Sequence, residues 1–336
     1  MRFSGIIGQD AVKNHLISAV RSGKIRSAYI FDGEEGSGKM MVAKAFASYI
    51  LCENGPYSGA PGNENVFDSC GECPSCKRIM HDNSPDVIYV THEKTVVSVD
   101  DIREQLSDTI STRPYISKKK IYIVDDAEKM NNQAQNALLK TLEEPPDYAV
   151  IILLSKNAWS FLPTVLSRCV KLSMKPLLME EVQAYLMKNK ALPDYMARLF
   201  AMFSQGNLGK AIAAASDEGF IERRGTVVEL MRSIKGKPLY EYSKKAAELS
   251  SDKEGLQQFF DLLLLWYRDV LLYKSCLDES RLCFRDESFT IRQQAKDLSY
   301  QKINAIFDAI DEARMKINFN VRADVTLTEL FSICST

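Results

Sequence analysis

The hydrophobic pattern in the first half of the chain alternates between two periods. Short runs of consecutive apolar residues, such as 28–31 and 149–154, predict strands that are buried on both faces. Between these runs, apolar residues recur every three or four positions, which is typical of helices that bury one face. Strands that alternate with helices favour a parallel sheet covered on both sides, so the pattern predicts an α/β domain.

The pattern changes after about residue 175, where the strand signals end and helical spacing continues alone. The expected fold class is therefore α/β followed by an all-α region. The expected strands are 28–31, 86–90, 120–125 and 148–155. The expected helices are 9–22, 39–51, 99–111, 132–143, 179–189, 193–204, one from residue 210, 222–234, and further helices between 239 and 336.

The charge balance limits the kinds of partner. The chain has 336 residues, with 43 basic and 44 acidic side chains and a formal net charge of −1. This balance gives no global field for DNA or a membrane surface, so any nucleic-acid contact must be local or shared with partners. The apolar cluster at 259–272 contains three charged residues and is too short to span a bilayer. With no signal peptide at the N-terminus, we expect a cytoplasmic protein with no membrane association.

A phosphate-binding loop follows the first expected strand. Residues 33–40 are Gly-Glu-Glu-Gly-Ser-Gly-Lys-Met, which is G-x-x-x-x-G-K with Met40 where Ser or Thr belongs. The glycines let backbone N–H groups surround phosphate oxygens, and Lys39 reaches the outer phosphates. The missing hydroxyl would hold Mg²⁺, for which a thioether is a poor ligand. The sequence therefore predicts a nucleotide-binding type of fold with poor ATP hydrolysis.

A second nucleotide motif ends the strand expected at 120–125. The apolar run there is followed by a Walker B pair, in which Asp125 orients Mg²⁺ and Asp126 polarises the attacking water. The second acid is usually Glu in ATPases of this class, and the shorter Asp126 disturbs catalytic positioning. An ordinary turn at the end of a strand is the alternative interpretation. The candidate residues of this degenerate nucleotide site are Gly33, Gly36, Ser37, Gly38, Lys39, Met40, Asp125 and Asp126.

Four cysteines have the spacing of a metal site. Cys70, Cys73 and Cys76 form C-x-x-C-x-x-C, and Cys52 precedes them at the end of the helix that follows the phosphate loop. Four thiolates suit a closed tetrahedral structural Zn²⁺ site. An iron–sulfur cluster is the competing assignment, because the same spacing occurs in ferredoxins. Disulfides are disfavoured in a cytosolic protein.

Several segments resemble one family. The runs 3–9, 33–40 and Asn136–Pro146 (Asn-Ala-Leu-Leu-Lys-Thr-Leu-Glu-Glu-Pro-Pro), with Ser167-Arg168-Cys169, resemble the bacterial clamp-loader ATPases of the AAA+ class. The resemblance is dense up to about residue 175 and weak beyond it. It implies three domains, which are an AAA+ P-loop domain with an inserted zinc module at about 52–80, a small helical lid domain and a C-terminal helical collar domain. Their expected bounds are 1–175, 176–225 and 226–336.

The resemblance also implies roles for individual residues. By its motif position, Arg168 is an arginine finger that acts in trans on the ATP of a neighbouring subunit. Such a finger stabilises the charge of the transferring phosphoryl group and contributes about 10³-fold or more to the rate. The family carries a zinc module where this chain has its four cysteines, which favours zinc over an iron–sulfur cluster.

Three residues depart from the family's motor subunits. Those subunits carry an arginine that senses the γ-phosphate where this chain has Gly209, and Met40 and Asp126 weaken two further parts of the same site. The combination resembles a family subunit that keeps its finger but has lost its own ATP site. Binding of ATP or ADP remains open, and both Ser155 and Asn157 are candidates for the polar sensor after the strand at 148–155.

The expected function is to help load the sliding clamp onto primed DNA during replication, with little or no ATP hydrolysis by this chain. The implied partners are the gamma/tau and delta subunits of a heteropentamer, with the clamp and primer–template DNA reached through the complex. One alternative is an active motor subunit of the gamma/tau type, which residues 40 and 209 disfavour. The other is a zinc-dependent DNA-binding protein with a vestigial P-loop, which the net charge of −1 disfavours.

Overall fold

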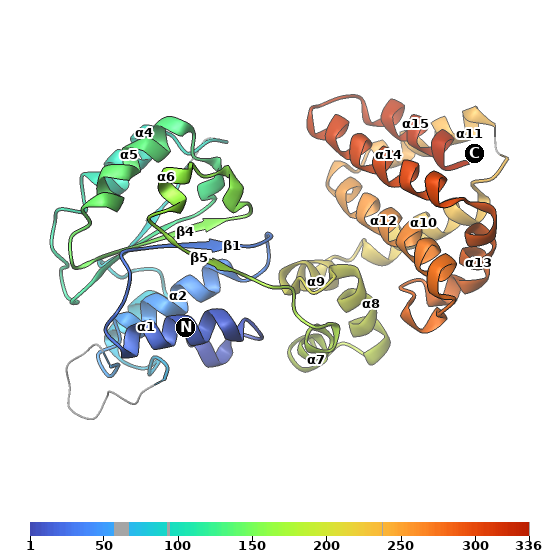
Figure 1. The fold of residues 1–336 in the computed structure, drawn as a ribbon. Helices are drawn as coiled ribbons and strands as arrows, with labels where there is room; N and C mark the ends of the chain where they lie inside the picture. Colours follow the sequence, from blue (N-terminus) through green and yellow to red (C-terminus); the bar gives the residue numbers. More distant parts are fainter. Residues whose placement is uncertain (57–66, 93–94, 237, 336) are drawn as a thin grey trace. The chain divides into compact units, whose positions relative to one another are not determined.

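The computed structural model describes residues 1–56, 67–92, 95–236 and 238–335. It divides into two compact units, whose elements are labelled in Figure 1. The first unit consists of Met1–Tyr185 with Gln205–Lys210, and the second consists of Leu186–Ser204 with Ala211–Thr336. The three-domain division expected from the sequence remains a prediction.

A five-stranded parallel sheet forms the centre of the first unit, with the strand order β2-β3-β4-β1-β5. The four strands expected from the sequence are present, and the structure adds a fifth at the edge beside β1. The strands are β1 (Ala28–Asp32), β2 (Val87–Val90), β3 (Lys120–Val124), β4 (Ala149–Ser155) and β5 (Val170–Ser173).

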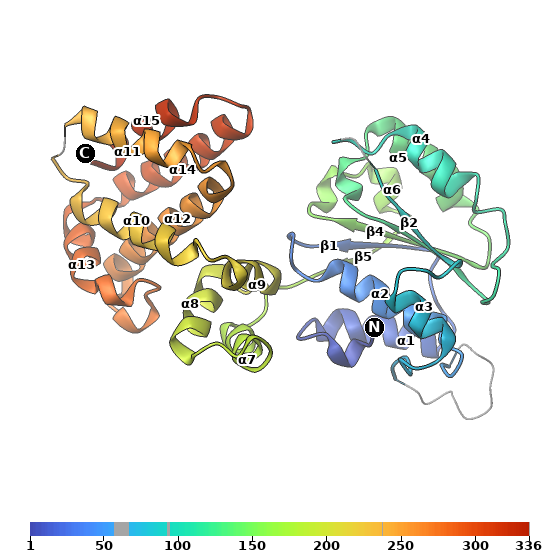
Figure 2. The same cartoon turned by 180° about the vertical axis from the view of Figure 1, so that it is seen from behind.

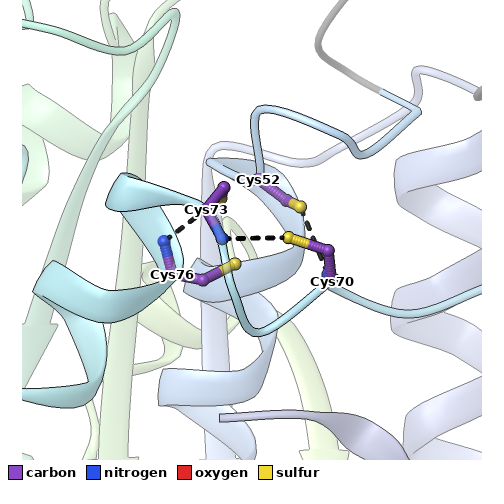
Figure 3. A group of neighbouring side chains, drawn as sticks. All are labelled: Cys52, Cys70, Cys73 and Cys76. Atoms are coloured by element: carbon purple, nitrogen blue, oxygen red, sulfur yellow. Dashed lines mark hydrogen bonds between the residues drawn. The ribbon is translucent and has the colours of Figure 1, made fainter.

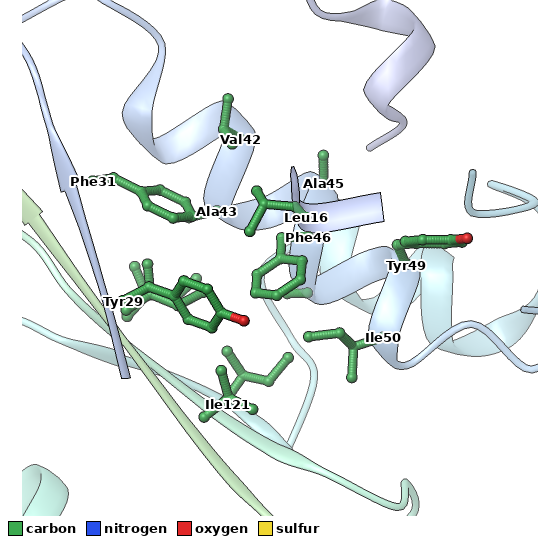
Figure 4. Packing of buried hydrophobic residues seen from close by; sticks show 14 of the residues in the cluster. Leu16, Tyr29, Phe31, Val42, Ala43, Ala45, Phe46, Tyr49, Ile50 and Ile121 are labelled. Atoms are coloured by element: carbon green, nitrogen blue, oxygen red, sulfur yellow. The ribbon is translucent and has the colours of Figure 1, made fainter. Parts of the chain in front are cut away.

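Side chains of β1 alternate between the two faces of the sheet, as the period of two in a strand requires. Tyr29 and Phe31 belong to one buried cluster with residues of α1 and α2, and the Tyr29 ring meets Phe46 edge-on with 5.3 Å between centroids (Figure 4). Ala28 and Ile30 belong to the cluster on the opposite face, which α4, α5 and α6 cover. Both faces are therefore buried, which explains why the strands are almost wholly apolar.

The helices of the first unit follow the expected pattern with one difference. The helix expected over 99–111 is an α-helix only at Val99–Ile102 and continues as a π-helical turn at Arg103–Ser107, where Asp108 donates to the carbonyl of Arg103 five residues earlier. The helices are α1 (Asp10–Arg21), α2 (Lys39–Ile50), α3 (Pro74–Met80), α4 (Val99–Ile102), α5 (Asn132–Glu143) and α6 (Pro163–Leu166). Figure 2, the view from behind, shows α3 beside α2, which it contacts.

The second unit is helical throughout its described part. Its long helix α12 buries Trp266, whose indole N–H donates to Gln294 Oε1 at 2.8 Å and whose ring meets Phe284 edge-on. Two helices, α7 and α9, are shared between the units. The helices from α7 onward are α7 (Met179–Lys190), α8 (Asp194–Ser204), α9 (Leu208–Ser216), α10 (Phe220–Ser233), α11 (Leu239–Ser250), α12 (Lys253–Cys276), α13 (Ser288–Asp297), α14 (Tyr300–Asn318) and α15 (Ala323–Ser335).

The predicted fold class is confirmed, because a parallel α/β unit is followed by a helical unit. Within the described ranges of the chain, no helix is both long enough and apolar enough to cross a membrane.

Candidate functional site

The phosphate loop leaves the carboxyl end of β1 and leads into α2. Gly36 and Gly38 have φ angles of 79° and 91°, a backbone region that favours glycine. The Lys39 ammonium is bound within the loop, because Nζ donates to the carbonyl oxygens of Gly33 and Glu34 at 2.5 and 2.8 Å. Burial lowers the pKa of Lys39, although nearby carboxylates oppose the shift. The predicted loop residues are thus assembled, with the lysine held by carbonyl groups of its own loop.

The residue after the lysine is part of the packing against the sheet. Met40 is partly buried and packs against the hydrophobic cluster between α2 and the sheet. A thioether in this place offers Mg²⁺ no oxygen ligand. Ser37 Oγ is buried and has no hydrogen-bond partner among the described residues, so one polar group of the loop is left unsatisfied. The residues present fit a phosphate-loop backbone better than they fit a complete Mg²⁺–nucleotide site.

The two acids after β3 lie at the carboxyl ends of the strands, as the phosphate loop does. Asp126 has a φ of 46°, and its carboxylate faces the ammonium of Lys129 at 2.5 Å, His92 Nε2 at 3.8 Å and Lys156 Nζ at 3.9 Å. Burial acts to raise the pKa of Asp126, but the hydrogen bond from Lys129 and the nearby positive charges outweigh it, so the pKa is lowered. Asp125 is exposed and accepts the Asp126 backbone N–H at 3.0 Å. The second acid is therefore engaged by basic groups of this chain.

Lys156 was not among the residues singled out in the sequence. It follows the last residue of β4, and its Nζ lies 2.7 Å from Glu35 Oε2 in the phosphate loop. The hydrogen bond from this lysine to Glu35 raises the pKa of Lys156. Lys156 therefore joins the phosphate loop to Asp126. The signal available in the sequence was its place directly after a strand that ends at the same edge of the sheet.

Both candidates for the polar sensor lie at the end of β4. The Ser155 hydroxyl is buried and accepts the N–H of Asn157 at 3.0 Å. The Asn157 side chain accepts the N–H of Trp159 at 3.0 Å and so begins the short helical turn Ala158–Ser160. Each side chain is bound within its own turn, and the choice between them remains open.

Arg168 lies just beyond the end of α6 and is exposed. Its guanidinium donates to Glu143 Oε1 at 2.8 Å and to the carbonyl of Thr164 at 2.9 Å, with Ser167 Oγ at 3.4 Å. Glu143 is the last residue of α5, and no local pattern in the sequence indicates that it meets Arg168. The arginine is thus oriented by its own chain while its side chain stays accessible at the surface.

The four predicted cysteines come together between the end of α2 and the start of α3 (Figure 3). Their Sγ atoms all lie within 4.8 Å of one another, and tetrahedral zinc with Zn–S bonds of about 2.3 Å needs sulfurs roughly 3.8 Å apart. Backbone N–H groups of Cys70, Cys73 and Cys76 donate to the sulfurs of Cys52, Cys70 and Cys73 at 3.3–3.4 Å, an arrangement that favours thiolates. All four are free cysteines. The cluster can therefore bind a metal ion, although part of the expected module, 57–66, lies outside the described residues.

Gly209, at the place of the missing sensor arginine, also reaches the phosphate loop. It is the second residue of α9, and its N–H donates to the carbonyl of Gly36 at 3.0 Å. The structure therefore brings together the three predicted departures, Met40, Asp126 and Gly209, around one loop. The structure also places the ion pair between Lys156 and Glu35 at this loop.

The fold and the loop define a protein of the P-loop nucleotide-binding type, with a cysteine cluster attached to its α/β unit. The sequence model of the family described as DNA polymerase III, delta subunit, matches residues 8–178. The chain belongs to this family, and the clamp-loader resemblance drawn from the sequence is confirmed.

Relatives and solved structures are similar over most of the chain. The delta' subunit of DNA polymerase III from Bacillus subtilis is 29% identical over 96% of this chain and 94% of its own length. The tau subunit from the same organism is 27% identical over 95% of this chain but only 58% of its own length. A gamma subunit-related protein from Thermotoga maritima, solved as a crystal structure, has a TM-score of 0.47 and 22% identity, with 95% of this chain and 97% of that chain covered.

Proposed function

We propose that this chain is a delta'-type subunit of a DNA polymerase III clamp loader that supplies Arg168 to the ATP of a neighbouring subunit and hydrolyses little or no ATP itself. The observation that carries the proposal is the contrast between Arg168 and the phosphate loop. Arg168 is exposed and held by Glu143 and Thr164, whereas Met40 provides no Mg²⁺ ligand and Lys39 is bound to its own loop.

The proposed chemistry at the neighbouring site is electrostatic. A guanidinium placed beside a γ-phosphate stabilises the negative charge that develops during phosphoryl transfer, so its effect appears in kcat. The planar group donates two hydrogen bonds in a fixed geometry, which a lysine ammonium does not reproduce. The ion pair with Glu143 lies near the surface and contributes only a fraction of a kcal/mol, up to about 1, so it orients the side chain without preventing contact with a partner.

The proposed partners are the gamma/tau and delta subunits of the clamp loader, in a heteropentamer that loads the sliding clamp onto primed DNA. The support is the naming of the similar chains as delta' and tau subunits of DNA polymerase III. The helices from about residue 226 onward would form the collar through which the subunits assemble, and 176–225 would form the lid. A cytoplasmic location follows from this role.

The cysteine cluster is proposed to bind one structural Zn²⁺ ion through Cys52, Cys70, Cys73 and Cys76. Four sulfurs and no open position suit a structural role, since a catalytic zinc keeps a site for water or substrate. The metal would connect the end of α2 to the start of α3.

The test is the steady-state ATPase and clamp-loading rate of a reconstituted complex that contains Arg168→Ala or Arg168→Lys. Both variants should assemble normally, because Arg168 is exposed. The site that receives the finger should lose about 10³-fold in rate, so the complex should lose the share of its activity that comes from that one site. Lysine should rescue poorly.

Three outcomes would contradict the proposal or part of it. Unchanged rates for both variants in an assembled complex would make Arg168 an ordinary surface charge. Robust DNA-stimulated ATP hydrolysis by the isolated chain would support the motor-subunit alternative instead. Failure to join gamma/tau and delta subunits, combined with tight DNA binding by the isolated chain, would support the zinc-dependent DNA-binding alternative.

A further inference from the structure

Two glycine backbones touch at the phosphate loop. The N–H of Gly209 donates to the carbonyl of Gly36 at 3.0 Å. A Cβ atom on Gly209 would lie 2.5 Å from Gly36 Cα and 2.7 Å from its carbonyl oxygen. Real Cβ atoms essentially never approach other atoms so closely, and the obstacle is backbone, which cannot turn aside as a side chain can. The contact therefore requires glycine at position 209.

The hydrogen bond from Gly209 also satisfies a backbone N–H group in the first turn of α9. The first N–H groups of a helix have no partner within the helix, and Gly209 and Lys210 are among the first residues of α9. The Gly209 N–H is satisfied by the phosphate loop, and the Lys210 N–H by Asn207 Oδ1 at 3.0 Å. The start of α9 is therefore completed by the loop and by Asn207, which acts as its N-terminal cap.

The Asn207 side chain is a second link to the loop. Its Nδ2 donates to the carbonyl of Glu35 at 2.6 Å, while its Oδ1 caps α9, so one carboxamide joins the two segments. Asn207 is buried, with 9% of its surface exposed, where a hydrogen bond is less weakened by water. A Cβ atom on Gly36 would lie only 2.6 Å from Asn207 Oδ1, so the loop also requires glycine where it meets this side chain.

The residue just before this segment's two links to the loop is held by the chain that follows β5. Gly206 accepts the N–H of Leu177 at 2.9 Å. Gly206 has a φ of 88°, and a Cβ atom there would lie 2.4 Å from the Leu177 carbonyl oxygen. Gly206 is thus held by Leu177, while Asn207 and Gly209 are held by the phosphate loop.

We propose that residues 206–210 form a latch that is bound to the phosphate loop by the chain's own hydrogen bonds, with no nucleotide required. In this interpretation Gly209 is more than the absence of a sensor arginine. It allows the close contact that fixes the latch, and no side chain, arginine included, fits there unless the loop moves. These contacts all lie within the first unit and are independent of the role of Arg168.

Hydrogen–deuterium exchange of the full chain, without nucleotide, tests the latch. Peptides that cover 205–210 and 33–38 should be protected in the wild type, and adding Mg–ATP should leave their exchange unchanged. Gly209→Ala should raise the exchange rate in both peptides by about tenfold or more, because the new methyl group separates the two backbones. Gly209 does not have a positive φ, so alanine adds no backbone strain of its own.

Gly225→Ala is the matched control. Gly225 also lies in a helix without a positive φ, but an added Cβ there meets no atom within 4 Å. Because alanine is the better helix former, this variant should keep wild-type exchange at 205–210 and be as stable or slightly more stable. A difference between the two variants therefore reports the contact and not the loss of glycine.

The variant Asn207→Asp distinguishes the role of Asn207 in the latch from its role as the cap of α9. Aspartate keeps an oxygen that can cap α9 but loses the amide that donates to Glu35, and it adds a negative charge near Glu34. It should raise exchange in both peptides without disturbing the fold.

The latch is refuted if 205–210 exchanges freely in the nucleotide-free wild type, or if Mg–ATP strongly protects it. It is also refuted if Gly209→Ala and Gly225→Ala behave alike at 205–210. A negative result with Arg168 variants would leave all of these outcomes unaffected, so the two proposals fail separately.

Discussion

The cysteine cluster and the phosphate loop lie in the same unit, and a short motif marks each of them in the sequence. They differ in how completely the groups that each kind of site needs are present and available for a ligand. The cluster has all four of its sulfur donors together, within 4.8 Å of one another. The phosphate loop has kept its glycines and Lys39, but the Glu35 carboxylate and the carbonyls of Glu35 and Gly36 are already paired with other parts of the chain, through Lys156, Asn207 and Gly209.

The difference shows how far a motif defines a site. The cysteine site takes three of its four sulfurs from one short motif and needs only Cys52, at the end of α2, from outside it, so correct spacing supplies most of the site. A nucleotide site also depends on acids, sensors and metal ligands that other segments bring to the loop. Loss or internal pairing of those groups changes the site while the motif still looks nearly complete.

The largest effect is expected from the cysteine cluster. Cys76→Ser should abolish stoichiometric zinc and lower stability by about 3 kcal/mol, or roughly 6–12 °C in Tm, because metal binding is coupled to folding. Metal analysis and thermal unfolding measure both. Cys276→Ser, at an exposed cysteine, is the control and should match the wild type.

A buried serine could destabilise the protein without any metal, and chelation separates the two causes. Wild type treated with a chelator should lose zinc and unfold near the temperature of Cys76→Ser. Iron with sulfide in a fresh preparation would replace the zinc assignment with a cluster. A fresh preparation without metal would remove the contrast between the two sites.

A smaller effect is expected at the phosphate loop from Asp126→Asn. Because the pKa of Asp126 is lowered in the fold, its ion pairs stabilise the protein above the pKa of the unfolded state, and this contribution is lost as pH falls through the lowered value. The variant should therefore be less stable by roughly 0.5 kcal/mol near neutral pH, with the difference shrinking as pH falls through the lowered pKa of Asp126 and absent once the carboxyl is protonated.

Urea unfolding at a series of pH values measures this difference. Asparagine tolerates the left-handed backbone at this position as well as aspartate does, so loss of charge is the main change. A difference that stays constant down to low pH would mean that the ion pairs with Lys129 and Lys156 do not stabilise the loop.

The smallest effect is expected from Met40→Thr. Restoring a hydroxyl for Mg²⁺ leaves Asp126 paired with basic groups and leaves Gly209 in contact with the loop, so the isolated chain should still hydrolyse almost no ATP. Phosphate release with Mg–ATP, with and without primed DNA, measures the rate. The double variant Lys39→Ala/Met40→Thr sets the background, and a rate well above it would show that Met40 alone had disabled the site.

Local sequence determined much of the first unit. The apolar runs predicted four of the five strands, because a strand between two helical layers must be apolar on both faces. The edge strand Val170–Ser173 was not predicted, since it alternates between partly buried and exposed residues and has neither a continuous apolar run nor a strong turn signal. The helix over 99–111 was predicted too long, because the change to a π-helical turn leaves no mark in the hydrophobic period.

The residues of the candidate sites also fall into two groups, those that the sequence predicted and those that only the tertiary structure revealed. Spacing identified Cys70, Cys73 and Cys76, the loop glycines and Lys39, because the atoms of each motif are close in sequence, whereas the fold brings Cys52 to Cys70 from 18 positions away. Only the tertiary structure brought Lys156 to Glu35, which lies 121 positions away, and Asn207 to Glu35, which lies 172 positions away. Such contacts depend on how strands and loops meet at one edge of the sheet, and no local pattern of hydrophobic and polar residues encodes them.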